Sequence, residues 1–435
     1  MQHNRWFVVL GALMIQVSLG AIYIYSVFKP ALKEHFPAWS ATDLALPAQI
    51  LLAADALAMI AAGRLQDKFG PKKISIAGGL LLLLGMYIAA KAQTIFQFVF
   101  GFGLAGAGIG AAYVCPIAVC VKWFPDKRGL ITGLAVAGFG AGGLVFAPLA
   151  SYFISTIGVM ATLFYLGLIY FLAIIIGAQL MRVPPADYRP SGWNPLSCQA
   201  SLGIIKTDYA AKEMIKTRRF WILWLTYFIG CVAGLLVIMN LVTIWQAQAL
   251  AGAANAADIV SSFSFARILT QGALVVMIVS ILNSLGRIVW GRISDKNGRE
   301  KTLMMIFMFC GAALLILGSL NSFWSFVGAA SIIGFCFGGF LALYPAITAD
   351  YFGARNIGAN YGLMFTAYGV GGLLGPWLAP KLLSAIRDVP CETIDGAGKT
   401  IIKLVEVGSY ANSFILAGAL CLVAAFLVLK LKPYK

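Results

Sequence analysis

Two charged residues lie inside long apolar stretches of this sequence, and they are the residues best placed to do chemistry. Asp55 falls within the apolar stretch 45–64, and Arg287 falls within 269–291. A charge at the centre of a membrane-spanning helix costs about 2.5–3.5 kcal/mol on insertion scales, so a charge that is kept there is expected to have a function. These two residues are therefore the first candidates for a binding or coupling site.

Arg287 is suited to bind a carboxylate. Its guanidinium group can donate two parallel, charge-assisted hydrogen bonds to one anion. Asn283 stands four residues earlier, so on a helix its amide lies on the same face and can bond the same anion. The alternative is a buried ion pair between Arg287 and Asp55 that holds two parts of the chain together. Both can apply at different stages if the anion displaces Asp55.

Three tyrosines could line the rest of such a site. Tyr113 and Tyr344 each precede a proline within three residues, and Tyr368 lies next to a glycine in an apolar stretch. Proline inside a spanning helix frees a carbonyl group, which is tolerated where the helix is packed against protein or lines a wet cavity. We expect these three to be site residues. Weaker candidates in the first apolar stretch are Tyr23, Tyr25 and Gln16.

The elements that position these residues belong in a bilayer. Of the 435 residues, 61% are hydrophobic and only 11% are charged, against roughly 25% charged in soluble domains. A spanning helix needs about 20 predominantly apolar residues. Candidate spans lie near 6–28, 45–64, 74–92, 98–121, 129–152, 161–182, 220–246, 269–291, 302–320, 325–349, 357–380 and 408–430. The sequence therefore predicts an all-α membrane protein with twelve transmembrane helices.

A polar, proline-containing stretch separates the first six spans from the last six. We expect an N-terminal half over 1–182, a cytoplasmic linker over 183–218 and a C-terminal half over 219–435. Most of the 32 lysines and arginines fall on one side of the predicted spans. The positive-inside rule then places both termini in the cytoplasm, with the protein in the inner cell membrane. The first span shows no convincing signal-peptide cleavage site.

An internal repeat relates the two halves. The stretch 63–73, GRLQDKFGPKK, recurs at 291–301 as GRISDKNGREK, so that Asp67 corresponds to Asp295. Each copy lies in the loop after the second span of its half. Six of the eleven positions are identical. A match of this kind at equivalent places in the two halves indicates a duplication, which is common in transporters.

At these residues the sequence resembles the major facilitator superfamily, whose loop motif has the form G-x-x-x-D-x-x-G-x-[RK]-[RK]; the first copy departs from it at Pro71. The resemblance implies two halves that rock around a site at the midplane of the membrane. The motif carboxylates can pair with basic residues and hold the cytoplasmic side closed. The simpler interpretation is a tight basic turn, because exposed ion pairs are weak. The expected gate residues are Asp67, Asp295, Arg128 and Arg64.

Within this superfamily, the stretches 22–30 (IYIYSVFKP) and 343–353 (LYPAITADYFG) resemble the oxalate/formate antiporter group, which is related to the monocarboxylate transporters. The resemblance implies a substrate-binding arginine in the eighth helix, which falls on Arg287. It also implies aromatic cavity walls, which fall on Tyr344 and Tyr113.

Two departures from these relatives change the expected substrate and coupling. Oxalate carriers pair the arginine with a lysine in the eleventh helix, but this chain has no Lys or Arg from 362 to 380. A dicarboxylate would leave one carboxylate unpaired, at a cost of several kcal/mol. Animal-type proton symporters place an aspartate where this chain has Asn283, so Asp55 is the buried acid left to carry a proton. We predict a proton-coupled carrier of lactate, pyruvate or similar monocarboxylates; the alternative is an organic anion antiporter of the oxalate/formate type.

Other classes of protein lack their signatures. Two histidines and eight scattered cysteines suggest no metal site, cofactor or disulfide framework. GFGLAG at 101–106 fits G-x-G-x-x-G but lies in an apolar helix, so it is interpreted as a packing face and not a dinucleotide site. The net charge of +16 lies in loops, so no nucleic-acid partner is expected. We expect no catalytic residues, no enzyme activity and no role as a non-transporting sensor, which would usually carry a soluble signalling tail. The expected partners are a small organic anion, protons and the lipid bilayer, with the chain as a monomer.

Overall fold

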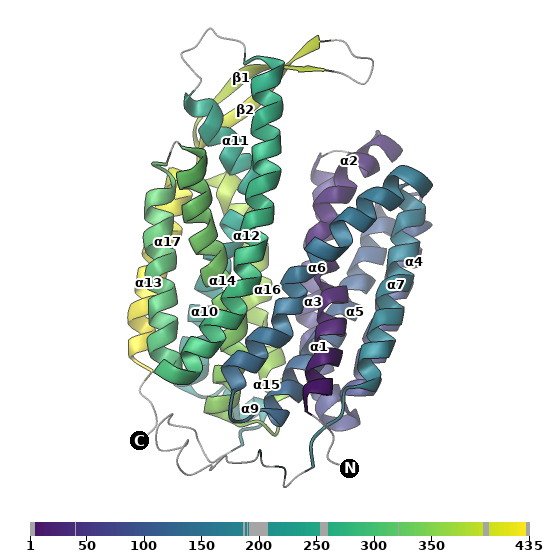
Figure 1. Ribbon diagram of the computed structural model, residues 1–435, viewed down its shortest axis with the longest axis vertical. Coiled ribbons are helices and arrows are strands. Elements are labelled where there is room, and N and C mark those ends of the chain that lie inside the picture. Colours follow the sequence, from purple (N-terminus) through teal and green to yellow (C-terminus); the bar gives the residue numbers. More distant parts are fainter. Residues whose placement is uncertain are drawn as a thin grey trace.

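The computed structural model describes residues 5–39, 41–185, 188, 190, 208–252, 260–320, 322–394 and 400–431. These residues form two helical bundles that stand side by side (Figure 1). The first contains α1 (Trp6–Leu19), η1 (Gly20–Ile24), α2 (Tyr25–His35), α3 (Ala41–Phe69), α4 (Pro71–Ala90), α5 (Ile95–Trp123), α6 (Arg128–Ile157) and α7 (Val159–Gln179). The second contains α9 (Ala211–Met214), α10 (Arg218–Ile238), α11 (Leu241–Gly252), α12 (Ser262–Asn297), α13 (Arg299–Leu317), α14 (Phe323–Phe352), α15 (Ile357–Met364), α16 (Thr366–Lys381) and α17 (Ala411–Leu429).

The predicted all-α membrane architecture is confirmed. Among the described residues, ten helices are long and apolar enough to cross a membrane. The first and eleventh predicted spans are instead broken helices, α1–η1–α2 and α15–α16. The break in the eleventh span falls at Phe365, between α15 and α16.

The seventh predicted span, 220–246, is wrong at its end. Helix α10 stops at Ile238, and the chain begins again as α11. The Asn240 side chain donates a hydrogen bond to the Leu236 carbonyl at 2.9 Å and satisfies one of the last acceptors of α10. Apolar residues continue beyond this point, so hydropathy alone could not locate the end of the helix.

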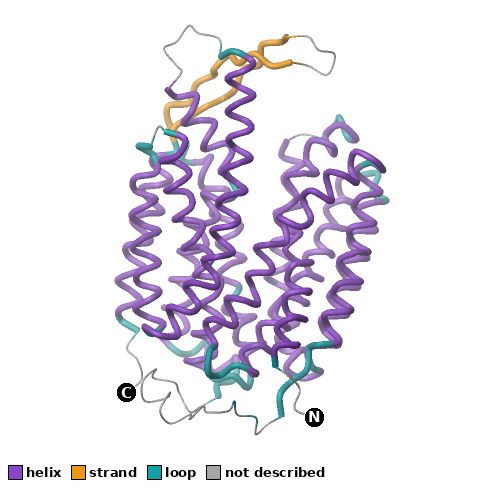
Figure 2. The backbone as a smooth tube through the Cα atoms, viewed as in Figure 1, coloured by secondary structure: helices purple, strands orange, loops and turns teal. Residues whose placement is uncertain are grey.

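A β-hairpin between the last two spans was not predicted. Strands β1 (Ser384–Ile394) and β2 (Thr400–Ser409) pair antiparallel with Pro390 opposite Leu404. Figure 2 shows the hairpin in orange at the end of the molecule opposite the chain termini. Its inner face packs in a small separate core made of Ala247, Leu250, Val260, Phe265, Val389, Cys391 and Val407. Burial there raises the pKa of the Cys391 thiol. The alternating pattern was overlooked because it lies in a loop of a helical protein.

The two halves touch along two seams. Helix α3 packs against α15 and α16, and α6 packs against α12 and α14. Both seams converge at the end where the described chain begins and finishes, which we name the terminal end, and the halves diverge toward the hairpin (Figure 1). Interior glycines also allow helices within one half to pack closely. As predicted, the glycines of α5 form a packing face, because a methyl group at Gly101 would lie 2.7 Å from the Ala89 nitrogen of α4.

The repeated motif supplies a close backbone contact in each seam. Gly63 of α3 lies against the backbone of Gly358, and Gly291 of α12 lies against the backbone of Gly129. The next motif glycines, Gly70 and Gly298, both have φ of +88° and turn the chain into the following helix. A duplicated sequence thus produces two equivalent seams.

Gly291→Ala is expected to destabilise the protein by about 1–3 kcal/mol, because its methyl group would collide with the Gly129 carbonyl across the seam. Gly328→Ala is the matched control, since the structure leaves open space around Gly328. Thermal unfolding in detergent measures the effect. Equal melting temperatures for the two variants would show that the seam does not need a glycine.

Candidate functional site

Arg287 is fully buried in α12, beside the seam between the halves. Its Nε donates a hydrogen bond to Asn283 Oδ1 at 3.0 Å, and its Nη1 donates to the Val136 carbonyl at 2.6 Å. Val136 belongs to α6, so this bond joins one half to the other. Nη2 is buried without a hydrogen-bond partner among the described residues. A buried charged donor without a partner costs free energy, so this nitrogen is a position where an anion would be stabilised.

The glycines of α6 make room for the arginine. A methyl group at Gly133 would collide with the Arg287 carbonyl, and one at Gly140 would lie 3.5 Å from the guanidinium carbon. Phe139, between them, places its ring 5.9 Å from that carbon. The guanidinium is therefore enclosed by backbone, an amide and an aromatic face, which is a low-dielectric setting for an anion.

Asp55 is the second buried charge, in α3. Its Oδ1 has no hydrogen-bond partner among the described residues, and it takes part in none of the ion pairs that these residues form. Asp55 and Arg287 therefore do not form the alternative structural ion pair in this conformation. Tyr361 of α15 lies within electrostatic reach of both charges. Asp55 and Arg287 thus each keep one buried atom without a hydrogen-bond partner among the described residues.

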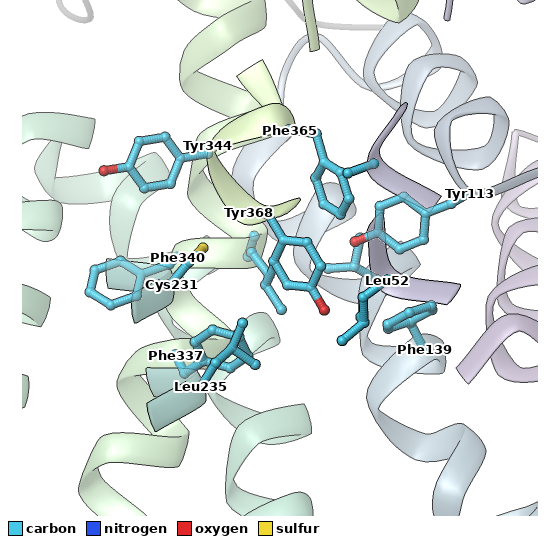
Figure 3. Close-up of a cluster of buried hydrophobic side chains, with 14 of the residues drawn as sticks. Leu52, Tyr113, Phe139, Cys231, Leu235, Phe337, Phe340, Tyr344, Phe365 and Tyr368 are labelled. Atoms are coloured by element: carbon cyan, nitrogen blue, oxygen red, sulfur yellow. The ribbon is translucent and has the colours of Figure 1, made fainter. Parts of the chain in front are cut away.

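Aromatic rings cross between the halves next to these charges. Tyr113 of α5 contacts Phe139 with ring centres 4.9 Å apart and Phe365 at 5.2 Å. Phe365 stacks on Tyr368 at 4.5 Å. Figure 3 shows Tyr368 between Phe365 and Leu52, with its hydroxyl on the side of the N-terminal half. Tyr113 and Tyr368 both contact Phe365, which the sequence did not single out.

Tyr344 does not join this central group. Its hydroxyl donates to Thr226 Oγ1 at 2.8 Å, and its ring stacks on Tyr227 at 4.1 Å. In Figure 3 it points away from Tyr368. Both partners belong to the C-terminal half, so in this conformation Tyr344 stabilises that half and does not face Arg287.

At the terminal end, the two motif carboxylates cap helices of the opposite half. Asp67 Oδ2 accepts a hydrogen bond from the Ala359 nitrogen at 2.9 Å, in the first turn of α15. Asp295 accepts hydrogen bonds from the Gly129 and Leu130 nitrogens at 2.8 Å each, in the first turn of α6. A helix N-terminus offers free N–H groups and a positive dipole end, which favour a carboxylate. These bonds form a pair of equivalent latches.

Ion pairs reinforce the latches. Lys122 pairs with Asp67 at 3.3 Å. Arg128 pairs with Asp350 at 2.7 Å, and Arg299 pairs with both Asp350 and Asp295 at 2.7 Å. The sequence pointed to Arg128 but not to Asp350 or Arg299. Expected gate residue Arg64 is exposed and makes no ion pair with the described residues.

Removing a latch carboxylate is expected to open the terminal end. Asp67→Asn or Asp295→Asn weakens the bond to a helix N-terminus by about 1–2 kcal/mol, which shifts the ratio of open to closed molecules about 5- to 30-fold. Spin labels at the exposed positions Lys73 and Lys301, one in each half, would report longer distances. Asp126→Asn is the control, because Asp126 pairs with Arg5 at 2.8 Å within one half. An unchanged distance distribution in both latch variants would rule the latch out.

Comparison with known proteins shows which family the chain matches. The model of the Major Facilitator Superfamily matches residues 9–376 and, separately, 237–435. The oxalate:formate antiporter of Oxalobacter formigenes is 30% identical over 383 residues, covering 87% of this chain and 85% of that protein. The apicoplast pyruvate carrier 1 of Toxoplasma gondii is 27% identical over 393 residues, covering 78% of this chain and 70% of that protein.

The similarity of the fold to solved structures agrees with this family match. The transporter FucP, solved in the outward conformation, superposes with a TM-score of 0.67 at 14% identity, covering 98% of this chain and 97% of that one. Because the family model spans well over half of the sequence, the protein belongs to the major facilitator superfamily and is a membrane transporter, not an enzyme.

Proposed function

We propose that the protein is a secondary active transporter of small monocarboxylates, such as lactate or pyruvate, driven by protons. The observation that carries this proposal is the buried guanidinium of Arg287. It keeps one nitrogen without a hydrogen-bond partner among the described residues and is bonded to the amide of Asn283. One arginine can neutralise one carboxylate through two parallel bonds. The similarity to a pyruvate carrier supports this choice of substrate.

The alternative is an organic anion antiporter, which the similarity to the oxalate:formate antiporter favours. A dicarboxylate needs a second cation or donor set, because an unpaired carboxylate at depth is costly. The sequence of α15 and α16 offers no Lys or Arg before Lys381. Tyr368 occupies the first turn of α16 instead, so we favour the monocarboxylate.

Asp55 is our candidate for the proton-carrying group. Its carboxyl is buried with an unsatisfied oxygen and without an ion pair among the described residues. An isolated charge in such a place is expensive, so the group gains from binding a proton while it is enclosed and can release it where water enters. Uptake of one proton with one anion would keep the translocated complex neutral.

The bond between Arg287 and Val136 suggests how binding couples to movement. A carboxylate that accepts hydrogen bonds from both Nη1 and Nη2 competes with the Val136 carbonyl, which belongs to the other half. Substrate binding would then remove one contact that holds the halves in this arrangement. The latches at the terminal end would open in the same cycle, with residues 1–182 and 219–435 moving as units about the linker 183–218.

The orientation follows from charge. The terminal end carries both latches and the basic loop residues, so we place it and both chain termini in the cytoplasm of a cell with the protein in its inner membrane. The halves diverge at the opposite end, which supports a conformation open to the outside. Both halves lie in one chain, so we propose that the transporter works as a monomer.

Uptake of lactate into proteoliposomes with an inward proton gradient tests the proposed function. The expected result is accumulation that needs no counter-anion inside and that a protonophore abolishes. Uptake that requires internal formate or oxalate would establish the antiporter instead. Failure to transport any monocarboxylate in either mode would overturn both readings of the site.

A further inference from the structure

Gln16, in the N-terminal half, also has a buried side-chain oxygen without a hydrogen-bond partner among the described residues. It lies in α1 and is fully buried. Its Nε2 donates a hydrogen bond to the Tyr113 carbonyl at 3.2 Å, whereas its Oε1 has no hydrogen-bond partner among the described residues. A buried amide oxygen without a hydrogen-bond donor destabilises the folded protein by about 1–3 kcal/mol. A ligand that donates a hydrogen bond to this oxygen would remove that cost.

The orientation of this amide is determined by its neighbour. The oxygen and nitrogen of a glutamine are exchanged by a simple flip, and the hydrogen-bond network decides between the two. Here the neighbour is a backbone carbonyl, which can only accept. Nε2 must therefore face Tyr113, and Oε1 is left pointing the other way as an acceptor.

Gln16 and Arg287 flank the same short stretch of α6. A methyl group at Gly138 would lie 3.2 Å from Gln16 Cβ, and one at Gly140 would lie 3.5 Å from the Arg287 guanidinium carbon. Phe139, between the two glycines, contacts the ring of Tyr113, whose carbonyl holds Gln16. Gln16 and Arg287 thus both lie against residues 138–140 of α6. Gln16 Oε1 and Arg287 Nη2 are the atoms without partners among the described residues.

From this arrangement we propose that Gln16 is a substrate-binding residue that selects monocarboxylates bearing a hydroxyl group. The carboxylate takes the guanidinium, and the hydroxyl donates to Gln16 Oε1. A 2-oxo acid offers only an acceptor at the same place, and an unsubstituted acid offers nothing. The inference rests on the proposed function and narrows it from small monocarboxylates to hydroxy acids, of which 2-hydroxypropanoate is the smallest chiral member.

The test is a transport competition in proteoliposomes with acids of equal chain length. 2-Hydroxypropanoate, 2-oxopropanoate and propanoate compete against labelled 2-hydroxypropanoate, and the hydroxy acid is expected to inhibit at about 3- to 10-fold lower concentration than the other two, as one hydrogen bond allows. Gln16→Met, which keeps the side-chain volume, is expected to remove that difference.

The chain provides a chemically matched control. Gln248 in α11 also donates through Nε2 to a backbone carbonyl, that of Leu317, at 2.9 Å, and its buried Oε1 is also without a partner among the described residues. Gln248→Met is expected to leave the preference unchanged. If Gln16→Met does not fold, Gln16→Asn withdraws the acceptor by one methylene and is expected to lower the preference in the same direction.

The outcomes separate the two levels of the proposal. Equal inhibition by all three acids in the unaltered protein would overturn the role of Gln16 and leave monocarboxylate transport standing. A preference that persists in both Gln16 variants would assign it to another residue. Absence of transport for every acid would overturn the proposed function as well.

Discussion

Arg287→Lys is expected to lower the rate of monocarboxylate uptake about 10- to 100-fold. Lysine keeps the charge but replaces a planar fork by a single point charge, so one of the two parallel bonds to the carboxylate is lost. A hydrogen bond to a charged group contributes about 1.5–3 kcal/mol, and each 1.4 kcal/mol is a factor of ten. The variant would also lack the hydrogen bond from Arg287 Nε to Asn283 Oδ1, which is 3.0 Å long and orients the guanidinium group.

Arg267→Lys is the matched control for this experiment. Arg267 lies on the same helix, α12, but is exposed near the hairpin end. The same substitution there should leave uptake unchanged, which separates loss of the anion site from a general effect on α12. Unaltered uptake by Arg287→Lys in folded protein would refute the anion-binding role.

Asp55→Asn is expected to uncouple transport from the proton gradient. A gradient of one pH unit stores about 1.4 kcal/mol per proton, which supports about tenfold accumulation of the anion if one proton moves with it. The amide cannot take up or release a proton, so accumulation should fall to equilibrium with the outside. Because asparagine has the same size, exchange of labelled for unlabelled substrate should continue.

The control for Asp55→Asn is Asp388→Asn, on the exposed surface of the hairpin. Accumulation and exchange should both be normal in that variant. Proton-driven accumulation that survives in Asp55→Asn would assign the proton to another group or to the substrate itself.

Local spacing explains which parts of the site could be predicted from the sequence. Asn283 and Arg287 are four residues apart on one helix, and the structure joins them as expected. The repeated motif predicted two equivalent carboxylates, and both reach a helix of the other half. Gly63 and Asp67 share a face because they are also four apart, whereas Arg64 follows Gly63 directly and is turned toward solvent.

Contacts between distant helices could not be predicted in this way. Periodicity indicates which face of a helix is buried, but not which backbone carbonyl of another helix meets it. The bond from Arg287 to Val136 and the network around Asp350 depend on how α6 crosses α12 and α14. Phe365 was missed because its role comes from a break between α15 and α16 within an otherwise apolar run.

The central claim is that one arginine receives one carboxylate, and ligand-induced stabilisation of the purified protein tests it most directly. A ligand that binds the folded state raises its apparent melting temperature with concentration. Lactate is expected to raise it in the unaltered protein and not in Arg287→Lys, while oxalate and malonate leave it unchanged. Stabilisation by oxalate equal to that by lactate, or by lactate in both proteins, would contradict the account.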